Sequence, residues 1–280
     1  MKVYISVDIE GATGIVSFSQ CGRLSSEHYD YGFARRMLTH DVNAAIRGAR
    51  RAGATEIVVK DAHATCKNLL IDELEPDTQL ISGYGSGRDG MMDGIDSSFS
   101  AAFLVGYHGM AGAMHALMDH ALIGGLHQFW INGRLAGEIA VSAAVAGFYG
   151  VPTVLVTSDQ IACAEAEADV PRIRTYTTKE GLGRYMGKLK HPSETRRGIE
   201  DAAFQAIQSV NTIAPLNIDG AVTMRASFRT TEEADLSAQM ENVDRLDAYT
   251  LQWTRTDFMA AHRAAICIFN LSVRGRQSGT

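Results

Sequence analysis

The sequence predicts an α/β protein with a mostly parallel sheet flanked by helices, and with a smaller C-terminal α+β lobe. Four short apolar runs have the length and composition of buried strands, and helical patterns separate them. Past about residue 185 the elements shorten into a β-α-β-α order. We therefore expect an α/β domain over residues 1–185 and a smaller α+β lobe over 186–280.

The strands predicted for the first domain are "VYISV" (3–7), "EIVVK" (56–60), "AFLVGY" (102–107) and "TVLVTS" (153–158). A helix is expected between the first two, because apolar residues recur there at spacings of three and four: Tyr31, Ala34, Leu38, Val42, Ala45 and Ala49. Gly53 stands where such a helix should end. Two further helices are predicted over 138–149 and 161–170. Strands that alternate with helices imply parallel pairing with right-handed crossovers.

The smaller lobe is predicted from five segments. These are a helix over 191–210 with Ser193 as its cap, a strand over 221–228, a helix near 232–240, a strand over 248–254 and a helix near 257–270.

Composition and charge limit the classes of partner. The chain has 280 residues, and its 26 Lys and Arg against 32 Asp and Glu give a net charge of −6, so no nucleic-acid partner is expected. The longest nearly apolar stretch, 139–150, is too short to span a bilayer, and no secretory signal precedes the first strand. The four cysteines are scattered without a CxxC pair, which is typical of reduced thiols in a cytoplasmic protein.

Acidic and histidine side chains follow three predicted strands. Asp8 and Glu10 end the first and share a face of it, His63 ends the second, and His108 ends the third. Ligand sites of open α/β sheets lie beyond the carboxyl ends of the strands, so we expect these side chains to meet. Two like charges at the end of a buried strand need a cation between them.

The segment 114–141 adds further candidates. Glu138 follows Gly137 at a predicted helix start, where it either joins the site or only stabilises the positive end of the helix. His115, His120 and His127 lie in the same segment, and the pattern alone does not choose among them. Asp61 shares a strand face with His63 and is predicted to orient it.

Mixed Asp, Glu and His ligands are typical of zinc, manganese, cobalt or iron in hydrolytic sites. Asp8, Glu10, His63, His108 and Glu138 are too many for one catalytic ion but suit two ions that share Asp8 as a bridge. Two divalent cations against three carboxylates leave a positive charge that holds hydroxide at neutral pH. No serine or cysteine nucleophile motif competes with this interpretation.

Six short motifs, in this order and spacing, carry a resemblance: "SVDIEGATG" (6–14), "KDAH" (60–63), "GYH" (106–108), "MDHALIG" (118–124), "FWING" (129–133) and "GEI" (137–139). Together they resemble the D-aminopeptidase DppA family of dizinc peptidases, most strongly over residues 1–180. The resemblance implies an aminopeptidase for short peptides or amides that begin with a D-amino acid. It also implies a ring-shaped homo-oligomer that encloses a chamber.

The resemblance assigns roles to individual residues. It implies two zinc ions bridged by Asp8, with Glu10 and His108 on one ion and with His63 and Glu138 on the other. It makes His120 the catalytic histidine. Lys179 matches a recurring family lysine, and a contact with a substrate carboxylate is expected of it.

Two rival functions share the same residues. One is a dimetal hydrolase of other amides or of phosphate esters, which a panel of both substrate types would separate. The other is a non-catalytic peptide-binding protein of a dipeptide-uptake system, which would bind peptides without turnover and tolerate metal removal.

Overall fold

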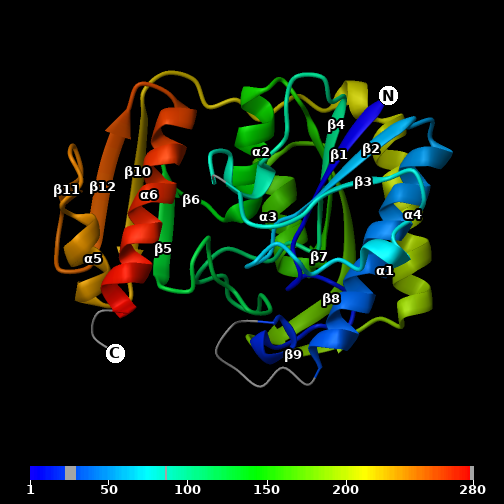
Figure 1. Cartoon of the computed structure of the whole chain (residues 1–280), viewed down its shortest axis with the longest axis horizontal. Helices are drawn as coiled ribbons and strands as arrows, with labels where there is room; N and C mark the ends of the chain where they lie inside the picture. Colours follow the sequence, from blue (N-terminus) through cyan, green and yellow to red (C-terminus); the bar gives the residue numbers. More distant parts are fainter. Residues whose placement is uncertain (23–29, 86, 278–280) are drawn as a thin grey trace.

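The computed structural model describes residues 1–22, 30–85 and 87–277, which form a larger and a smaller lobe (Figure 1). The larger lobe holds a seven-stranded sheet in the order β3-β2-β1-β4-β7-β8-β9. Its strands are β1 (Lys2–Val7), β2 (Glu56–Asp61), β3 (Gln79–Ile81), β4 (Ala101–Val105), β7 (Thr153–Asp159), β8 (Arg174–Gly183) and β9 (Met186–Leu189). The first six run parallel and β9 is antiparallel, so the predicted fold class is confirmed.

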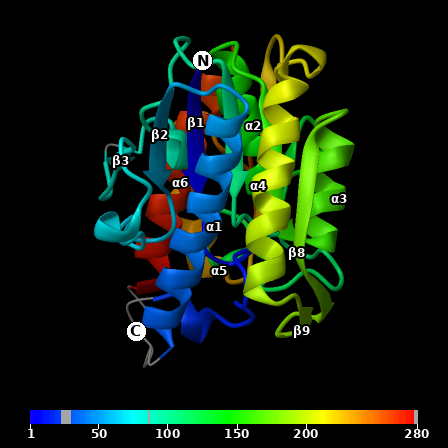
Figure 2. The ribbon, with the colours of Figure 1, turned by 90° about the vertical axis from the view of Figure 1, so that its right-hand side faces the viewer.

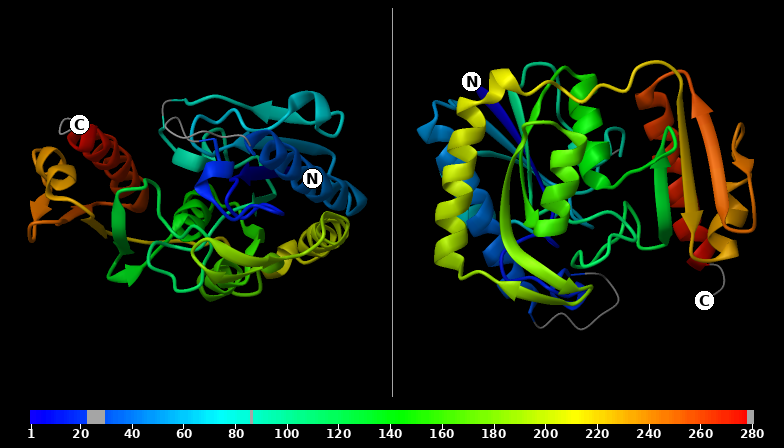
Figure 3. Two further views of the ribbon diagram at one scale, coloured as in Figure 1. Left: turned by 90° about the horizontal axis from the view of Figure 1, so that it is seen from below. Right: turned by 180° about the vertical axis from the view of Figure 1, so that it is seen from behind.

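Helices cover both faces of this sheet. On one face α1 (Tyr31–Arg51) and α4 (Pro192–Gln208) lie side by side, as Figure 2 shows. On the other face, toward the smaller lobe, lie α2 (Glu138–Phe148) and α3 (Gln160–Asp169) (Figure 3). Ala34, Leu38 and Val42 of α1 are fully buried, as their spacing predicts.

The smaller lobe is a five-stranded antiparallel sheet with two helices. Its strand order is β11-β12-β10-β5-β6. The strands are β5 (Leu126–Ile131), β6 (Arg134–Leu135), β10 (Val222–Phe228), β11 (Asp244–Arg245) and β12 (Thr250–Arg255), and the helices are α5 (Thr231–Ser237) and α6 (Phe258–Gln277). None of the helices that the structure describes has the length and apolar character needed to cross a bilayer.

A single boundary at residue 185 does not separate the strands and helices of the larger lobe from those of the smaller lobe. Strands β5 and β6 leave the first half of the chain to join the smaller sheet, while α4, beyond residue 185, packs on α1 of the larger lobe. The division into 1–185 and 186–280 stays a prediction as a statement about domains. Four short 3-10 helices complete the elements: η1 (Phe18–Gln20), η2 (Ile71–Glu73), η3 (Gly90–Met92) and η4 (Val210–Thr212).

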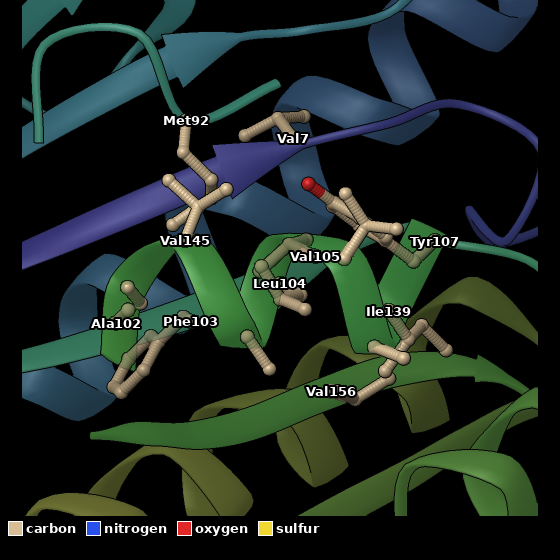
Figure 4. Packing of buried hydrophobic residues seen from close by; sticks show 14 of the residues in the cluster. Val7, Met92, Ala102, Phe103, Leu104, Val105, Tyr107, Ile139, Val145 and Val156 are labelled. Atoms are coloured by element: carbon tan, nitrogen blue, oxygen red, sulfur yellow. The ribbon is translucent and has the colours of Figure 1, made fainter. Parts of the chain in front are cut away.

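The core beneath α2 fixes the edge of the sheet at which the polar residues gather. Figure 4 shows Ile139 and Val145 of α2 over the strands that carry Val7, Val105 and Val156, and all five side chains are fully buried. A helix that is apolar on every side is buried on every side. Helix α2 accordingly lies between the large sheet and α6, and its first residue, Glu138, is buried at the carboxyl edge of the sheet.

Candidate metal centre

Six acidic and histidine side chains meet at the carboxyl edge of the large sheet. Asp8 and Glu10 follow β1, His63 follows β2 and His108 follows β4, while Glu138 begins α2 and His120 lies in the loop before β5. All six are buried, with at most 7% of any residue exposed. The structure thus brings together every metal ligand predicted from the sequence, and it adds His120 to them.

Two glycines allow the ends of β1 and β4 to approach closely. The Gly11 N–H donates to the Gly106 carbonyl at 2.7 Å, and the Asp8 N–H donates to the Val105 carbonyl at 2.9 Å. Gly106 has a φ of +75°, and a Cβ there would lie 2.2 Å from the Asp8 carbonyl oxygen. A larger residue would therefore push apart the two strand ends that carry Asp8 and His108.

Asp8 lies between two histidines. Its Oδ1 is 2.9 Å from His63 Nδ1, and its Oδ2 is 3.4 Å from His108 Nε2. His63 Nδ1 is also 3.1 Å from Glu10 Oε2, whereas His108 Nε2 is 3.2 Å from Glu138 Oε1. The shortest contacts thus join His63 to Glu10 and His108 to Glu138, whereas the ligand atoms of Asp8, Glu10 and His108 also lie within 4.8 Å of one another, so the pairing that the family resemblance implies stays a prediction.

His120 lies across both groups. Its Nε2 is 3.8 Å from Glu10 Oε1 and 3.9 Å from Glu138 Oε1. Its ring stacks on that of His108, with the centroids 3.9 Å apart and the planes inclined by 11°. His115 and His127 are exposed and lie outside the cluster, so of these three histidines His120 is the one that lies among the predicted ligands.

Backbone carbonyls set the protonation of all three rings in the cluster. His63 Nε2 donates to the Cys21 carbonyl, His108 Nδ1 to the Gly109 carbonyl and His120 Nδ1 to the Met118 carbonyl, at 2.8 to 3.0 Å. Because a carbonyl only accepts, the proton of each neutral ring stays on that nitrogen. The other nitrogen, directed at the carboxylates, then carries the lone pair that a metal ligand or a general base needs.

The charges of the cluster favour bound cations. Burial and the charge of Glu10 raise the pKa of Asp8 to about 7. Burial alone would lower the pKa of His63 and of His108, yet the neighbouring carboxylates raise both pKa values well above the ordinary range. Three carboxylates out of contact with water thus demand positive charge, which metal ions supply more fully than two protons.

The donor atoms fit a metal. His108 Nε2 is buried and forms no hydrogen bond within the described part of the chain, although two carboxylate oxygens lie within 3.4 Å. A nitrogen that close to two carboxylate oxygens suits ligands that share a metal ion. Ligand atoms of Asp8, Glu10 and His108 lie within 4.8 Å of one another, as do those of His108, His120 and Glu138. Nitrogen and carboxylate oxygen are ordinary zinc ligands.

Two expectations about neighbouring residues change. Asp61 does not contact the His63 ring. Its carboxylate accepts from the Asn68 side chain at 2.7 Å, and Asn68 in turn donates to the His63 carbonyl at 2.8 Å. Asp61 therefore supports the loop that carries His63, while the Cys21 carbonyl orients the ring.

The expectation that Lys179 contacts a substrate carboxylate is wrong. Lys179 is fully buried, and its ammonium donates to the carbonyls of Glu10, Ala12 and Ile15 at 2.5, 2.8 and 2.6 Å. All three donors of the ammonium are thus used within the loop that follows β1. Lys179 fixes the loop that carries Glu10.

A cavity of about 450 Å³ opens from the cluster toward the smaller lobe. One wall is formed by the metal-site residues and by Lys60 and Cys66, and another by Val141 and Val145 of α2. The third wall comes from α6, through His262, Ile266, Phe269, Asn270, Val273 and Arg276. The sequence pattern did not identify this wall, because the helical spacing of α6 reads only as a face packed on its own sheet.

Comparisons with known proteins agree with this geometry. The sequence model of the D-aminopeptidase family matches residues 1–267. The chain is 31% identical to a D-aminopeptidase of Bacillus subtilis (strain 168) over 277 residues, which are 98% of each protein. It superposes with a TM-score of 0.92, at 30% identity and 98% coverage of both chains, on the "Zn-dependent D-aminopeptidase DppA from Bacillus subtilis, a self-compartmentalizing protease". Because both the family model and this relative span nearly the whole chain, the protein belongs to the D-aminopeptidase family.

Proposed function

We propose that this chain is a zinc-dependent aminopeptidase that hydrolyses short peptides or amides with an N-terminal D-amino acid. The observation that carries the proposal is the buried cluster, in which Asp8 presents one oxygen to His63 and the other to His108. The solved relative is described as zinc-dependent, and the curated relative as a D-aminopeptidase. Manganese, cobalt or iron are further candidates for the same ligands.

The ligand contacts support two ions. Asp8 would be the ligand shared by both. The ligand atoms of Asp8, Glu10 and His108 lie within 4.8 Å of one another, which supports the predicted pairing of Glu10 with His108 and of His63 with Glu138. Each ion would then have three protein ligands, which would leave a position for water or substrate. The Leu122 N–H donates to Glu138 Oε1 at 2.6 Å and so restricts this carboxylate to one orientation.

When bound, the ions would supply an activated water and polarise the scissile carbonyl. The chain itself positions His120 to move the proton. Its Nδ1 donates to the Met118 carbonyl, so Nε2 faces the reacting centre with its lone pair and accepts the proton that the attack releases. Phe18 packs edge-on against the His120 ring, with the centroids 5.4 Å apart, and holds the ring plane. Return of this proton to the departing amine completes hydrolysis.

The proposal also covers the oligomeric state and the cellular location of the chain. The solved relative is described as self-compartmentalizing. In this chain the β8–β9 hairpin exposes Leu182, Tyr185 and Met186 by 53 to 61% of each residue, and exposed apolar groups of this kind are typical of subunit contacts. We therefore include a ring-shaped homo-oligomer in the proposal. None of the four cysteines, all of them described, forms a disulfide, which fits the cytoplasm as its location.

Steady-state hydrolysis of D-alanine amide and L-alanine amide by zinc-loaded protein tests the function. We expect the D-amide to be cleaved with the larger kcat/KM and a chelator to abolish turnover. A preference for the L-amide would contradict the stereochemical assignment. Turnover of phosphate esters alone would favour a different dimetal hydrolase, and peptide binding without any turnover would favour a binding protein.

A further inference from the structure

Lys60 is a buried cation in the wall of the cavity that contains the metal ligands. It is the penultimate residue of β2, only 2% exposed, and it lines the cavity together with Asp8 and His63. Its ammonium donates to the Gly83 carbonyl at 3.3 Å. No carboxylate of the described residues lies within ion-pair distance of it, in contrast to Lys2, whose Nζ is 3.1 Å from Glu56. The ammonium also interacts with the Cys66 thiol, so Lys60 keeps a donor for a molecule that enters the cavity.

The acidic residues that line the cavity have other partners. Asp89 accepts from the Tyr149 hydroxyl at 2.9 Å, Asp93 accepts from the Asp89 N–H at 2.8 Å, and Asp8 and Glu138 belong to the metal cluster. The other strongly basic residue in the cavity wall, Arg276, is engaged as well, since it lies 3.3 Å from the buried Glu233. Burying an ammonium without an anion is costly, which makes Lys60 a site for an anionic group of a ligand.

We infer that Lys60 binds the terminal carboxylate of a short peptide whose scissile bond lies at the metal cluster. The inference depends on the proposed function and narrows its substrate class from amides in general to peptides with a free C-terminal carboxylate. Lys60, Asp8 and His63 line the same cavity of about 450 Å³, and an extended peptide advances about 3.5 Å per residue. A cavity of this size suits dipeptides and tripeptides.

A pair of substrates and a pair of proteins test this inference, and the members of each pair differ by one charge. The substrates are D-alanyl-D-alanine and its C-terminal amide, and the proteins are the zinc-loaded wild type and Lys60→Met. We expect the wild type to prefer the free carboxylate and Lys60→Met to lose roughly 10- to 100-fold in kcat/KM for it, as for the loss of one charge-assisted hydrogen bond. The kcat/KM for the amidated substrate should change less than threefold. The conservative variant Lys60→Arg should keep the preference.

The controls separate Lys60 from its neighbours and from the fold. Lys67→Met, an exposed lysine on the next loop, should change neither substrate. Circular dichroism and zinc content should match the wild type in each variant. If Lys60→Met fails to fold, the inference is still tested by whether the wild type and Lys60→Arg both prefer the substrate with the free carboxylate.

Three results would count against the inference. Equal use of both substrates by the wild type would overturn it while leaving the proposed function intact. A preference that persists in Lys60→Met, or that disappears in Arg276→Met instead, would assign the carboxylate to another residue. If the wild type cleaves neither substrate and no D-aminoacyl amide, the proposed function fails, and this inference fails with it.

Discussion

His108 and His120 stack face to face, 3.9 Å between ring centroids, and each turns its Nε2 toward Glu138 Oε1, at 3.2 and 3.9 Å respectively. The two rings are therefore almost equivalent in orientation but not in distance. His108 Nε2 is close enough to Asp8 and Glu138 to share a metal with them, while His120 Nε2 lies farther from the nearest carboxylate oxygens. We propose that this difference in distance separates a metal ligand, His108, from a proton carrier, His120.

The first prediction tests that separation. His120→Ala should keep the zinc content and the fold, while kcat falls by roughly 10²- to 10⁴-fold, as for the loss of general acid–base assistance. Elemental analysis beside steady-state kinetics measures both. His115→Ala, an exposed histidine in the same loop, serves as the control and should change neither quantity. Loss of an ion in His120→Ala would make this residue a ligand, and normal turnover would remove it from the chemistry.

The convergence of Asp8, Glu10, His63 and His108 could be predicted from the sequence, because parallel strands deliver their carboxyl ends to one edge. Strand ends alone do not choose His120, since its position depends on how residues 109–125 fold back over the sheet. From the sequence, only the resemblance of "MDHALIG" to a family motif assigned a catalytic role to His120. The role of Lys179 was misassigned for a related reason: its acceptors, the carbonyls of Glu10, Ala12 and Ile15, lie more than 160 residues away in the chain.

Four strands of the larger lobe, β1, β2, β4 and β7, follow their predicted hydrophobic runs, and α1, α2 and α3 lie within two residues of the predicted ends, whereas β3, β8 and β9 were not predicted. Strand β5 was not predicted, because its buried residues Leu126, Phe129 and Ile131 are interrupted by polar and half-exposed ones. Its burial comes from pairing with β10, about a hundred residues later. Such pairing is a tertiary effect that outweighs local preference.

A second prediction concerns the shared ligand. Asp8→Asn should lower the zinc content from about two ions per chain toward zero, because a neutral amide cannot balance two cations. His63→Ala and His108→Ala should each retain about one ion, since each histidine serves one side of Asp8. Asp96→Asn, at an exposed position, should keep both ions. Full metal content in Asp8→Asn would show that this carboxylate is not the bridge.

A third prediction concerns Lys179. Lys179→Met removes the common donor of three buried carbonyls, so the free energy of unfolding should fall by roughly 3 kcal/mol or more. Zinc affinity should fall as well, because Glu10 belongs to the loop that the ammonium holds. Urea unfolding and zinc titration measure these effects. Lys188→Met, on the neighbouring strand β9 with its side chain 74% exposed, should leave both unchanged. Normal stability and zinc binding in Lys179→Met would contradict this role.

His262 of α6 links acidity to stability at the contact between the lobes. It is 2% exposed, and its Nε2 has no hydrogen-bond partner within the described ranges. A Cβ on Gly90 of η3 would lie 3.2 Å from that nitrogen, so the ring packs directly against the larger lobe. Burial lowers the pKa of His262 from 6.5 to about 4, although the charge of Asp89 acts in the opposite direction.

The fourth prediction follows from the sign of that shift. Between pH 6.5 and 4 the unfolded chain binds a proton at His262 that the folded chain excludes, so stability falls as the pH falls through this window. At pH 5 the loss from this group is about 2 kcal/mol relative to neutral pH. His262→Gln cannot take up that proton, so its stability should fall less than that of the wild type. Urea midpoints at pH 7.5 and pH 5, with the same zinc concentration, measure the difference, because other titrating groups are common to both proteins.

His127→Gln, at an exposed position, should follow the wild type. If His262→Gln and the wild type lose equal stability over this range, His262 is already protonated in the folded protein or carries its proton without cost, and the contact between α6 and η3 does not sense acid.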